Sequence, residues 1–298
     1  MTRPEPLRAA VIGAGRMGGA MVETLRSAGY DVTVYNRSRD KAEAVAETTG
    51  ALVAATPAEA AASSKVVLSS LADDNAVIAT HTGPNGTVSG LTSGSVLVET
   101  STINPQTLSV LEPDVTATGA TLLDGPVSGS VALVQQSKLT FMVGGDAAAL
   151  EAVRPVLEAL SAKIFHVGEL GAGATIKLAV NAIVHSTNVA LAEALVLAEE
   201  AGVDRATAYE VFAGSAAASP FLAYKQAAFV DPENAPVAFS LDLVKKDVDL
   251  ILGLADSVGV PMTQFEGGRA VTEQAIEAGY GNKDMSAVAS YLRSAHTK

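Results

Sequence analysis

The sequence GELGAGATIKLAVNAIVHSTNVALAEALVLAEEAG runs from Gly168 to Gly202 and decides the fold of this chain. Between Gly173 and Gly202 it contains no glycine or proline, and Ala, Leu, Val and Ile dominate. This composition predicts one long helix over about residues 173–201, about 42 Å long at a rise of about 1.5 Å per residue. Apolar residues occupy nearly its whole circumference, so we expect the helix to be buried.

The polar residues of this helix share one stripe. At about 100° per residue, Lys177, Asn181, His185 and Asn188 fall within a sector of about 80°. A membrane span is the alternative reading of so apolar a run, but a Lys, two Asn and a His inside it argue against that. A lone buried Lys could also reach the surface or form a core ion pair. A Lys with an Asn one turn on favours the wall of a polar site.

Composition limits the classes of function. The chain has 298 residues, enough for about two domains. Its net charge of −12 makes nucleic acid and anionic membranes poor partners. It has no cysteine, which excludes disulfides and thiolate chemistry, and its 4 His show no metal-ligand spacing, so no metal is expected. The first residues lack the apolar core of a secretory signal, and a cytoplasmic location is expected.

The start of the chain has the pattern of a dinucleotide-binding unit. Arg8–Ile12 is a short apolar run, a helical pattern ends near Ala28, and Asp31–Tyr35 reads as the next strand. The turn between the first strand and the helix consists of Gly13, Ala14, Gly15, Arg16, Met17 and Gly18. A lone G-x-G-x-x-G is weak, but between a strand and a helix it predicts pyrophosphate bound at the helix N-terminus. The alternative is a glycine turn without a ligand.

The end of the second strand predicts which cofactor binds. NAD-binding units usually carry an acidic residue there for the ribose hydroxyl. This chain has Asn36, Arg37, Ser38 and Arg39 instead. An Arg side chain suits a 2′-phosphate, so NADP is the expected cofactor, unless the two Arg are only solvated turn charges.

Strand and helix patterns alternate up to residue 168 and are all helical afterwards. Further strands are expected near residues 65–69, 95–99, 121–123, 139–143 and 163–167. The predicted fold is therefore α/β: a doubly wound Rossmann sheet over residues 1–168, followed by a helical domain over 169–298 that the long helix joins to it. Ligands bind beyond the carboxyl ends of such strands. Candidate site segments there are Leu71–Asp73, Thr100–Thr102 and Asp124–Ser130.

Four motifs together resemble the β-hydroxyacid dehydrogenases over essentially the whole chain. They are Gly13–Gly18, Asp124–Gly129, Gly171–Asn181 and Lys246-Asp247. The resemblance implies an oxidoreductase with a Rossmann domain and a helical domain through which subunits form a homodimer or a higher oligomer. It also implies a small carboxylate-bearing substrate.

The resemblance assigns roles to particular residues. Lys177 matches the family's general acid/base, and Asn181 the amide that assists in binding substrate. Ser128 and Gly129 match the residues that hold the substrate carboxylate. Cofactor contacts are implied for Thr102 and Lys246, and for Leu71 and Ala72 after the strand at 65–69, while Asp247 is implied at the substrate.

Some positions depart from the family pattern. Ser130 replaces a common glycine, Ala72 a common proline, and Ser137-Lys138 stands where a glycine is usual. These departures bear on the substrate, whose side chain we expect to be read by residues such as Phe239, with Phe221 and Phe212 as further candidates.

Two alternatives stay open. Imine reductases share the architecture but generally replace the lysine, so Lys177 and Asn181 favour the hydroxyacid branch. A regulatory protein that binds NADP without turnover is the other alternative, and the same two residues argue against it.

Overall fold

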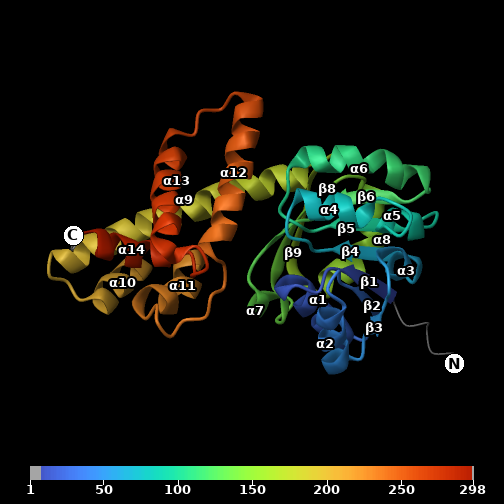
Figure 1. Ribbon diagram of the computed structural model, residues 1–298, viewed down its shortest axis with the longest axis horizontal. Coiled ribbons are helices and arrows are strands. Elements are labelled where there is room, and N and C mark those ends of the chain that lie inside the picture. The colour runs from blue at the N-terminus through green and yellow to red at the C-terminus, as the bar shows by residue number, and fades with distance from the viewer. Residues whose placement is uncertain (1–7, 297–298) are drawn as a thin grey trace. The chain divides into compact units, whose positions relative to one another are not determined.

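The computed structural model describes residues 8–296 and divides after Lys177 into two compact units. Residues 1–7 lie outside the described part. The prediction that the start of the chain carries no secretory signal falls partly on them. Figure 1 labels most of the helices and strands of both units.

The first unit is built on one nine-stranded, mostly parallel sheet. Its strand order is β3-β2-β1-β4-β5-β6-β8-β7, with β9 paired to β8. Only the pairings β6–β8 and β7–β8 are antiparallel. The strands are β1 Arg8–Ile12, β2 Asp31–Tyr35, β3 Leu52–Val53, β4 Val66–Ser69, β5 Val96–Glu99, β6 Thr121–Asp124, β7 Val127–Ser128, β8 Leu139–Gly144 and β9 Ser161–Gly168. This confirms the predicted doubly wound fold. The predicted strands omitted β3 and β7, which are too short to show an alternating pattern.

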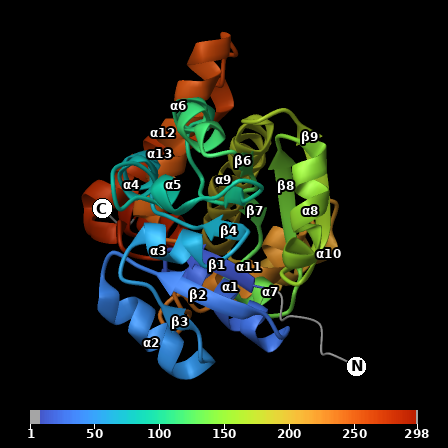
Figure 2. The ribbon, with the colours of Figure 1, turned by 90° about the vertical axis from the view of Figure 1, so that its right-hand side faces the viewer.

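Helices cover both faces of this sheet (Figure 2). They are α1 Arg16–Ser27, α2 Arg39–Thr49, α3 Pro57–Ala62, α4 Asp74–His81, α5 Thr87–Gly90, α6 Pro105–Ala117, α7 Val131–Val134 and α8 Ala147–Glu158. Alternate residues of each strand serve opposite faces: Ala9 and Val11 pack in one core with α1 and α8, while Ala10 and Ile12 pack in the other with α3 and α6. Both faces of the central strands are apolar because both are buried.

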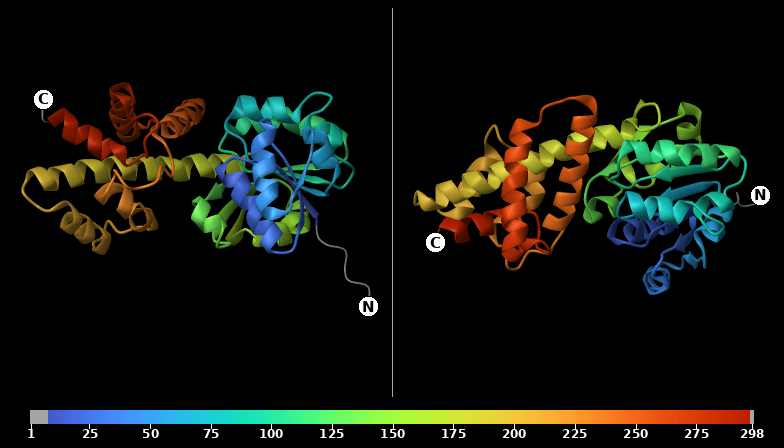
Figure 3. Two further views of the ribbon diagram at one scale, coloured as in Figure 1. Left: turned by 60° about the horizontal axis from the view of Figure 1, so that its bottom comes forward. Right: turned by 45° about the horizontal axis from the view of Figure 1, so that its top comes forward.

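The second unit is helical. Its elements are α9 Ala172–Glu200, which begins in the first unit, α10 Arg205–Gly214, α11 Pro220–Val230, α12 Leu241–Val258, α13 Thr263–Ala275, a π-helical turn Ile276–Tyr280, and α14 Ala287–His296. In Figure 3, α10 and α11 lie on the opposite side of α9 from α12 and α13. Leu191, Leu195, Tyr209, Phe229 and Val248 belong to the core between these helices.

Helix α9 is less buried than its composition suggested. Ile183 and Leu197 are 70% and 72% exposed, and Ile176 is 40% exposed. With exposed Ala190, these residues repeat every seven positions and form one apolar stripe, here called the α9 stripe. Among residues 8–296, α9 is the one helix long and apolar enough to cross a membrane, and 50% of its most apolar window is buried within the protein.

Candidate active site

The glycine turn between β1 and α1 packs closely against neighbouring backbone and leads into the N-terminus of α1. Gly13 has φ +105°, and a Cβ there would overlap the Ser70 carbonyl oxygen; a Cβ on Gly18 would overlap the Gly13 carbonyl oxygen. A Cβ on Gly15, by contrast, would meet no atom within 4 Å. Gly15 also caps α1 without a side-chain hydrogen bond. A helix N-terminus that follows such a turn fits the pyrophosphate of a dinucleotide, because the first N–H groups of a helix have no partner within the helix itself.

Asn36 is part of this turn. Its Oδ1 accepts a hydrogen bond from the Ala14 N–H at 2.9 Å, and its Nδ2 donates to the Ser38 carbonyl at 2.9 Å. The amide therefore ties the end of β2 to the glycine turn. The sequence predicts a cofactor contact at Asn36 but not its hydrogen bond to the glycine turn.

The two arginines after β2 have different surroundings. Arg39 donates from Nε to Glu43 Oε1 at 2.7 Å, one helical turn away on α2. Arg37 is exposed and makes no ion pair with any residue in the described range 8–296. Of the two, Arg37 is the guanidinium available to a ligand phosphate.

The turns after β4 and β5 are joined by a hydroxyl. The Leu71 N–H donates to Ser101 Oγ at 2.7 Å, and the Ser101 N–H donates to Glu99 Oε1 at 2.8 Å. Ala72 is exposed and Thr102 is half-buried. The two turns that carry the predicted cofactor residues are thus linked to each other by a hydrogen bond.

Asp124, at the end of β6, binds the start of α9. Its carboxylate accepts the Gly171 N–H at 2.9 Å and the Ala174 N–H at 2.6 Å. Burial raises the pKa of Asp124, although these backbone donors oppose the rise. A Cβ on Gly173 would overlap the Met142 carbonyl oxygen, so glycine is required for the helix to approach the sheet this closely.

The Asp124 carboxylate fixes the position of the first turn of α9, and Lys177 lies in the turn that follows. Lys177 lies five residues into α9 and is half-buried. The sequence places Asp124 in the candidate site segment Asp124–Ser130 but does not predict this capping role. The signal was present: a carboxylate that ends a parallel strand, and a Gly-x-Gly that opens a helix.

The predicted carboxylate-binding residues form the turn between β7 and α7. Ser128 pairs with Thr140 across β7 and β8, and Gly129 has φ +140° and is exposed. Within residues 8–296, the hydroxyls of Ser128 and Ser130 make no hydrogen bond to protein, and both residues are half-buried. Their role in binding a substrate carboxylate stays a prediction.

In the second unit, Asn181 is bonded to Asp247. Asn181 Nδ2 donates to Asp247 Oδ2 at 2.7 Å, His185 Nε2 lies 3.4 Å from the same oxygen, and Lys246 Nζ lies 3.0 Å from Oδ1. Asp247 is 1% exposed, so a solvated surface charge is excluded for it. Burial raises its pKa, but the His185 hydrogen bond and the Lys246 charge outweigh burial and leave the pKa below the ordinary value.

This pairing orients the Asn181 amide. An ionised carboxylate only accepts hydrogen bonds, so the NH2 group of Asn181 must face Asp247. The carbonyl oxygen is then the atom that Asn181 offers on its other side. The polar stripe therefore presents an acceptor one turn after Lys177.

A buried ion pair holds the segment that carries Phe239. Lys225 Nζ lies 2.7 Å and 2.8 Å from the two oxygens of Asp284, and Asp284 Oδ2 also accepts the N–H groups of Ala238 and Phe239 at 2.9 Å and 3.2 Å. The Phe239 ring stacks on His185 at 6.0 Å between centroids and 26° between planes. The sequence points to Phe239 as a candidate substrate residue but not to the Lys225–Asp284 ion pair that positions it.

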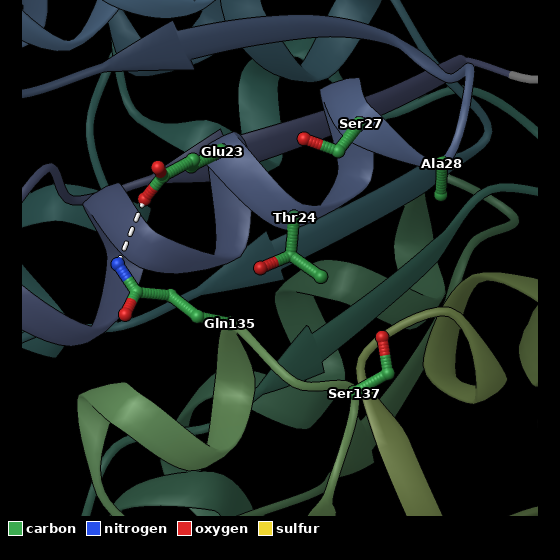
Figure 4. A pocket seen from close by; sticks show the side chains of 6 residues that line it. All are labelled: Glu23, Thr24, Ser27, Ala28, Gln135 and Ser137. Carbon is green, nitrogen blue, oxygen red and sulfur yellow. Dashed lines mark hydrogen bonds between the residues drawn. The ribbon is translucent and has the colours of Figure 1, made fainter.

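A cavity of about 320 Å³ lies elsewhere in the first unit (Figure 4). It follows the last turns of α1, at the other end of that helix from the glycine turn. Its lining residues are Glu23, Thr24, Ser27, Ala28, Gln135 and Ser137. None of these was predicted to act in a site. Over the described part of the chain, no group of three or more His, Cys, Asp or Glu side chains could hold a metal ion.

Two family models match nearly the whole chain. The NAD-binding domain of 6-phosphogluconate dehydrogenase matches residues 8–168, and the model described as NAD-binding of NADP-dependent 3-hydroxyisobutyrate dehydrogenase matches residues 171–292. Together the matches cover both units.

Individual proteins agree with these matches. Glyoxylate/succinic semialdehyde reductase 2 of Arabidopsis thaliana is 32% identical over 96% of this chain and 80% of its own length. The structure of a Mycobacterium tuberculosis 3-hydroxyisobutyrate dehydrogenase with L-serine has a TM-score of 0.84 and 27% identity, over 97% of this chain and 99% of that one. A Myxococcus stipitatus imine reductase with NADP+ shares the fold at a TM-score of 0.63 and 24% identity, over 96% and 99% of the two chains.

The fold and the relatives of this chain therefore point to the same family. Its sequence motifs are the glycine turn, the Gly171–Asn181 segment and the Lys246-Asp247 pair. Several relatives at 32% identity are named as reductases or dehydrogenases of small hydroxy acids and semialdehydes. The chain belongs to the β-hydroxyacid dehydrogenase family of nicotinamide-dependent oxidoreductases.

Proposed function

We propose that this protein is an NADP(H)-dependent oxidoreductase that interconverts a small β-hydroxy acid and its semialdehyde or keto acid. One observation carries the proposal: the Asp124 carboxylate fixes the start of α9, which carries Lys177 and then, one turn later, an Asn181 whose amide is oriented by Asp247. A cation and an oriented amide on one helix stripe suit proton transfer to a substrate oxygen.

In this mechanism Lys177 is the general acid/base. When bound, the nicotinamide cofactor supplies or accepts the hydride at the substrate carbon. During reduction, the Lys177 ammonium gives a proton to the carbonyl oxygen; during oxidation, its neutral amine takes the hydroxyl proton. The Asn181 carbonyl oxygen accepts a hydrogen bond from the substrate hydroxyl or from Lys177. Asp247 is buried, so it acts through Asn181.

We assign the cofactor to residues of the first unit. The glycine turn and the N-terminus of α1 that follows it hold the pyrophosphate, and Arg37 with Ser38 binds the 2′-phosphate of NADP. Thr102 contacts the nicotinamide side of the cofactor, as the family resemblance implies, and Leu71 and Ala72 also contact the cofactor. The exposure of Arg37 and the absence of an acid after β2 support NADP over NAD.

The substrate class follows from relatives and from the turn at Ser128. The named activities of the relatives concern glyoxylate, succinic semialdehyde and 3-hydroxyisobutyrate, all of which carry a carboxylate. Ser128, Gly129 and Ser130 offer two hydroxyls and backbone amides for such a group in a chain of net charge −12. We also propose a homodimer as the working assembly.

A substrate panel tests the proposal. Small aldehyde and keto acids are incubated with NADPH, and the corresponding hydroxy acids with NADP+, and absorbance at the reduced nicotinamide band is followed. Turnover of at least one acid, with little turnover of cyclic imines, is expected. Imine reduction without any carbonyl turnover would move the protein to the imine-reducing branch, and nucleotide binding without turnover across the whole panel would favour a regulatory protein.

A further inference from the structure

A buried polar cluster lies at the carboxyl ends of β4 and β5. It consists of Ser69, His81 and Glu99, which are 0%, 0% and 1% exposed. His81 Nε2 lies 2.8 Å from Glu99 Oε2 and 3.1 Å from Ser69 Oγ. The other ring nitrogen, Nδ1, has no hydrogen-bond partner among residues 8–296. Apolar side chains of similar size would fill such a position at lower free-energy cost, so the cluster calls for an explanation.

The cluster is linked to the turns that follow both strands. Glu99 uses Oε2 for His81 and Oε1 for the Ser101 N–H at 2.8 Å. Ser101 Oγ in turn accepts the Leu71 N–H at 2.7 Å. The chain of contacts therefore runs from His81 to the turn after β5 and on to the turn after β4.

The same turns abut the glycine turn. The Ser70 carbonyl oxygen occupies the space that a Cβ on Gly13 would need, and the Ser70 N–H donates to the Ile12 carbonyl at 2.8 Å. The turns after β1, β4 and β5 are thus one connected edge. A shift of the Glu99 carboxylate would therefore also shift the turns along this edge, because the hydrogen bonds that link them are short and buried.

We propose that His81, through Glu99, is a positioning residue that holds the Leu71 and Thr102 turns in the geometry that binds the nicotinamide cofactor. The inference rests on the proposed cofactor contacts of those two turns. His81 donates from Nε2 to the Glu99 carboxylate, which keeps that carboxylate aimed at the Ser101 N–H. Without this donor the carboxylate loses one of its two fixed partners, and the Ser101 hydroxyl and Leu71 amide lose a defined orientation.

The test compares His81→Leu with the unmodified protein. We expect the dissociation constant for NADPH, measured by nucleotide fluorescence, to rise about tenfold, the scale of one lost hydrogen bond to a charged group. The KM for the carbonyl substrate should stay within about twofold. In the nucleotide-free protein, amide hydrogen exchange over residues 70–73 should become faster. His81→Gln, which restores an N–H donor at a similar reach, should recover most of the affinity.

Thr24→Val is the matched control. Thr24 is 7% exposed, lies in the same unit, and donates from Oγ to the Ala20 and Val134 carbonyls at 2.8 Å and 3.2 Å. Its loss should lower the melting temperature and leave the NADPH dissociation constant unchanged.

The outcomes separate the possible roles. If His81→Leu lowers only the melting temperature, as the control does, the cluster is purely structural and the inference is overturned. Should His81→Leu not fold, Ser101→Ala, which removes only the acceptor of the Leu71 N–H, takes its place with the same expected loss. If the unmodified protein binds neither NADPH nor NADH, the proposed cofactor is refuted, and this inference with it.

Discussion

Lys177 is the residue on which the proposed chemistry depends. Lys177→Ala should lower kcat by about 10²–10⁴-fold, because a general acid/base contributes about that much. NADPH affinity should change little, since the proposed phosphate contacts lie in the Gly13–Gly18 turn. Steady-state kinetics across pH should also lose one limb of the kcat/KM profile. Retained carbonyl turnover with an unchanged pH profile, in a folded variant, would refute the assignment and favour the imine-reducing alternative.

Arg37 should decide the choice between NADPH and NADH. A guanidinium–phosphate contact is worth about 1.5–3 kcal/mol, so Arg37→Ala should reduce the preference for NADPH by about 10- to 100-fold. Arg39→Ala is the control, because Arg39 is already paired with Glu43 and should matter little. The ratio of kcat/KM for the two cofactors gives the answer. Equal use of both cofactors by the unmodified protein would sink the prediction.

Asp247 should make stability depend on pH at the acid end. Its pKa in the folded state is lowered by the His185 hydrogen bond and the Lys246 charge, whereas an unfolded Asp titrates at about 3.9. Between the folded and the unfolded pKa of Asp247, the unfolded chain therefore binds more protons than the folded one. The stabilisation by ionised Asp247 is present above about pH 4 and is lost as pH falls through the folded pKa. In thermal melts from pH 7 to pH 3, Asp247→Asn should lose less stability on acidification than the unmodified protein. Asp249→Asn, at an exposed ion pair with Lys245, should follow the unmodified curve.

At the scale of elements, the start of α9 is held by one carboxylate. Asp124→Asn should lower the free energy of unfolding by about 1–3 kcal/mol, because an amide NH2 would face one of the two backbone N–H groups that Asp124 now satisfies. Denaturant unfolding measures this loss. We also expect a lower kcat at nearly unchanged NADPH affinity, because Lys177 is carried by the same helix. Equal stability of the variant and the parent would mean that the cap contributes nothing.

The elements themselves were largely predictable, whereas their links were not. Alternating strand and helix patterns predicted the main strands of the first unit, and the purely helical pattern after residue 168 predicted the helical second unit. The Asp124 cap and the His81–Glu99 pair join positions 47 and 18 residues apart at their nearest contacts. No local pattern encodes such a pairing, because it depends on which strand ends become neighbours. The site residues named by resemblance stay predictions, and the contacts that orient them, such as that of Asn181 with Asp247, are seen only in the structure.

At the scale of the whole molecule, the α9 stripe predicts self-association. Ile183, Ala190 and Leu197 expose apolar side chains along one line of the helix, and exposed apolar stripes of this kind mark interfaces. Light scattering at micromolar concentration should give the mass of a dimer or a larger oligomer. Ile183→Glu combined with Leu197→Glu should shift the protein toward monomer while circular dichroism stays unchanged. Val110→Glu, at an exposed position on α6, is the control and should leave the mass as it was.

The close approach of α9 to the sheet also has a consequence for how this sequence can vary. An added methyl group at Gly173 would collide with the Met142 carbonyl oxygen, and one at Gly144 would collide with the Glu169 carbonyl oxygen as well as the Asp124 carboxylate. In a library of variants selected for turnover, both positions should tolerate no other residue, although neither is proposed to touch a ligand. Intolerance at these two glycines would report a lack of room between two pieces of backbone, and a survey that equated intolerance with catalysis would misplace the active site.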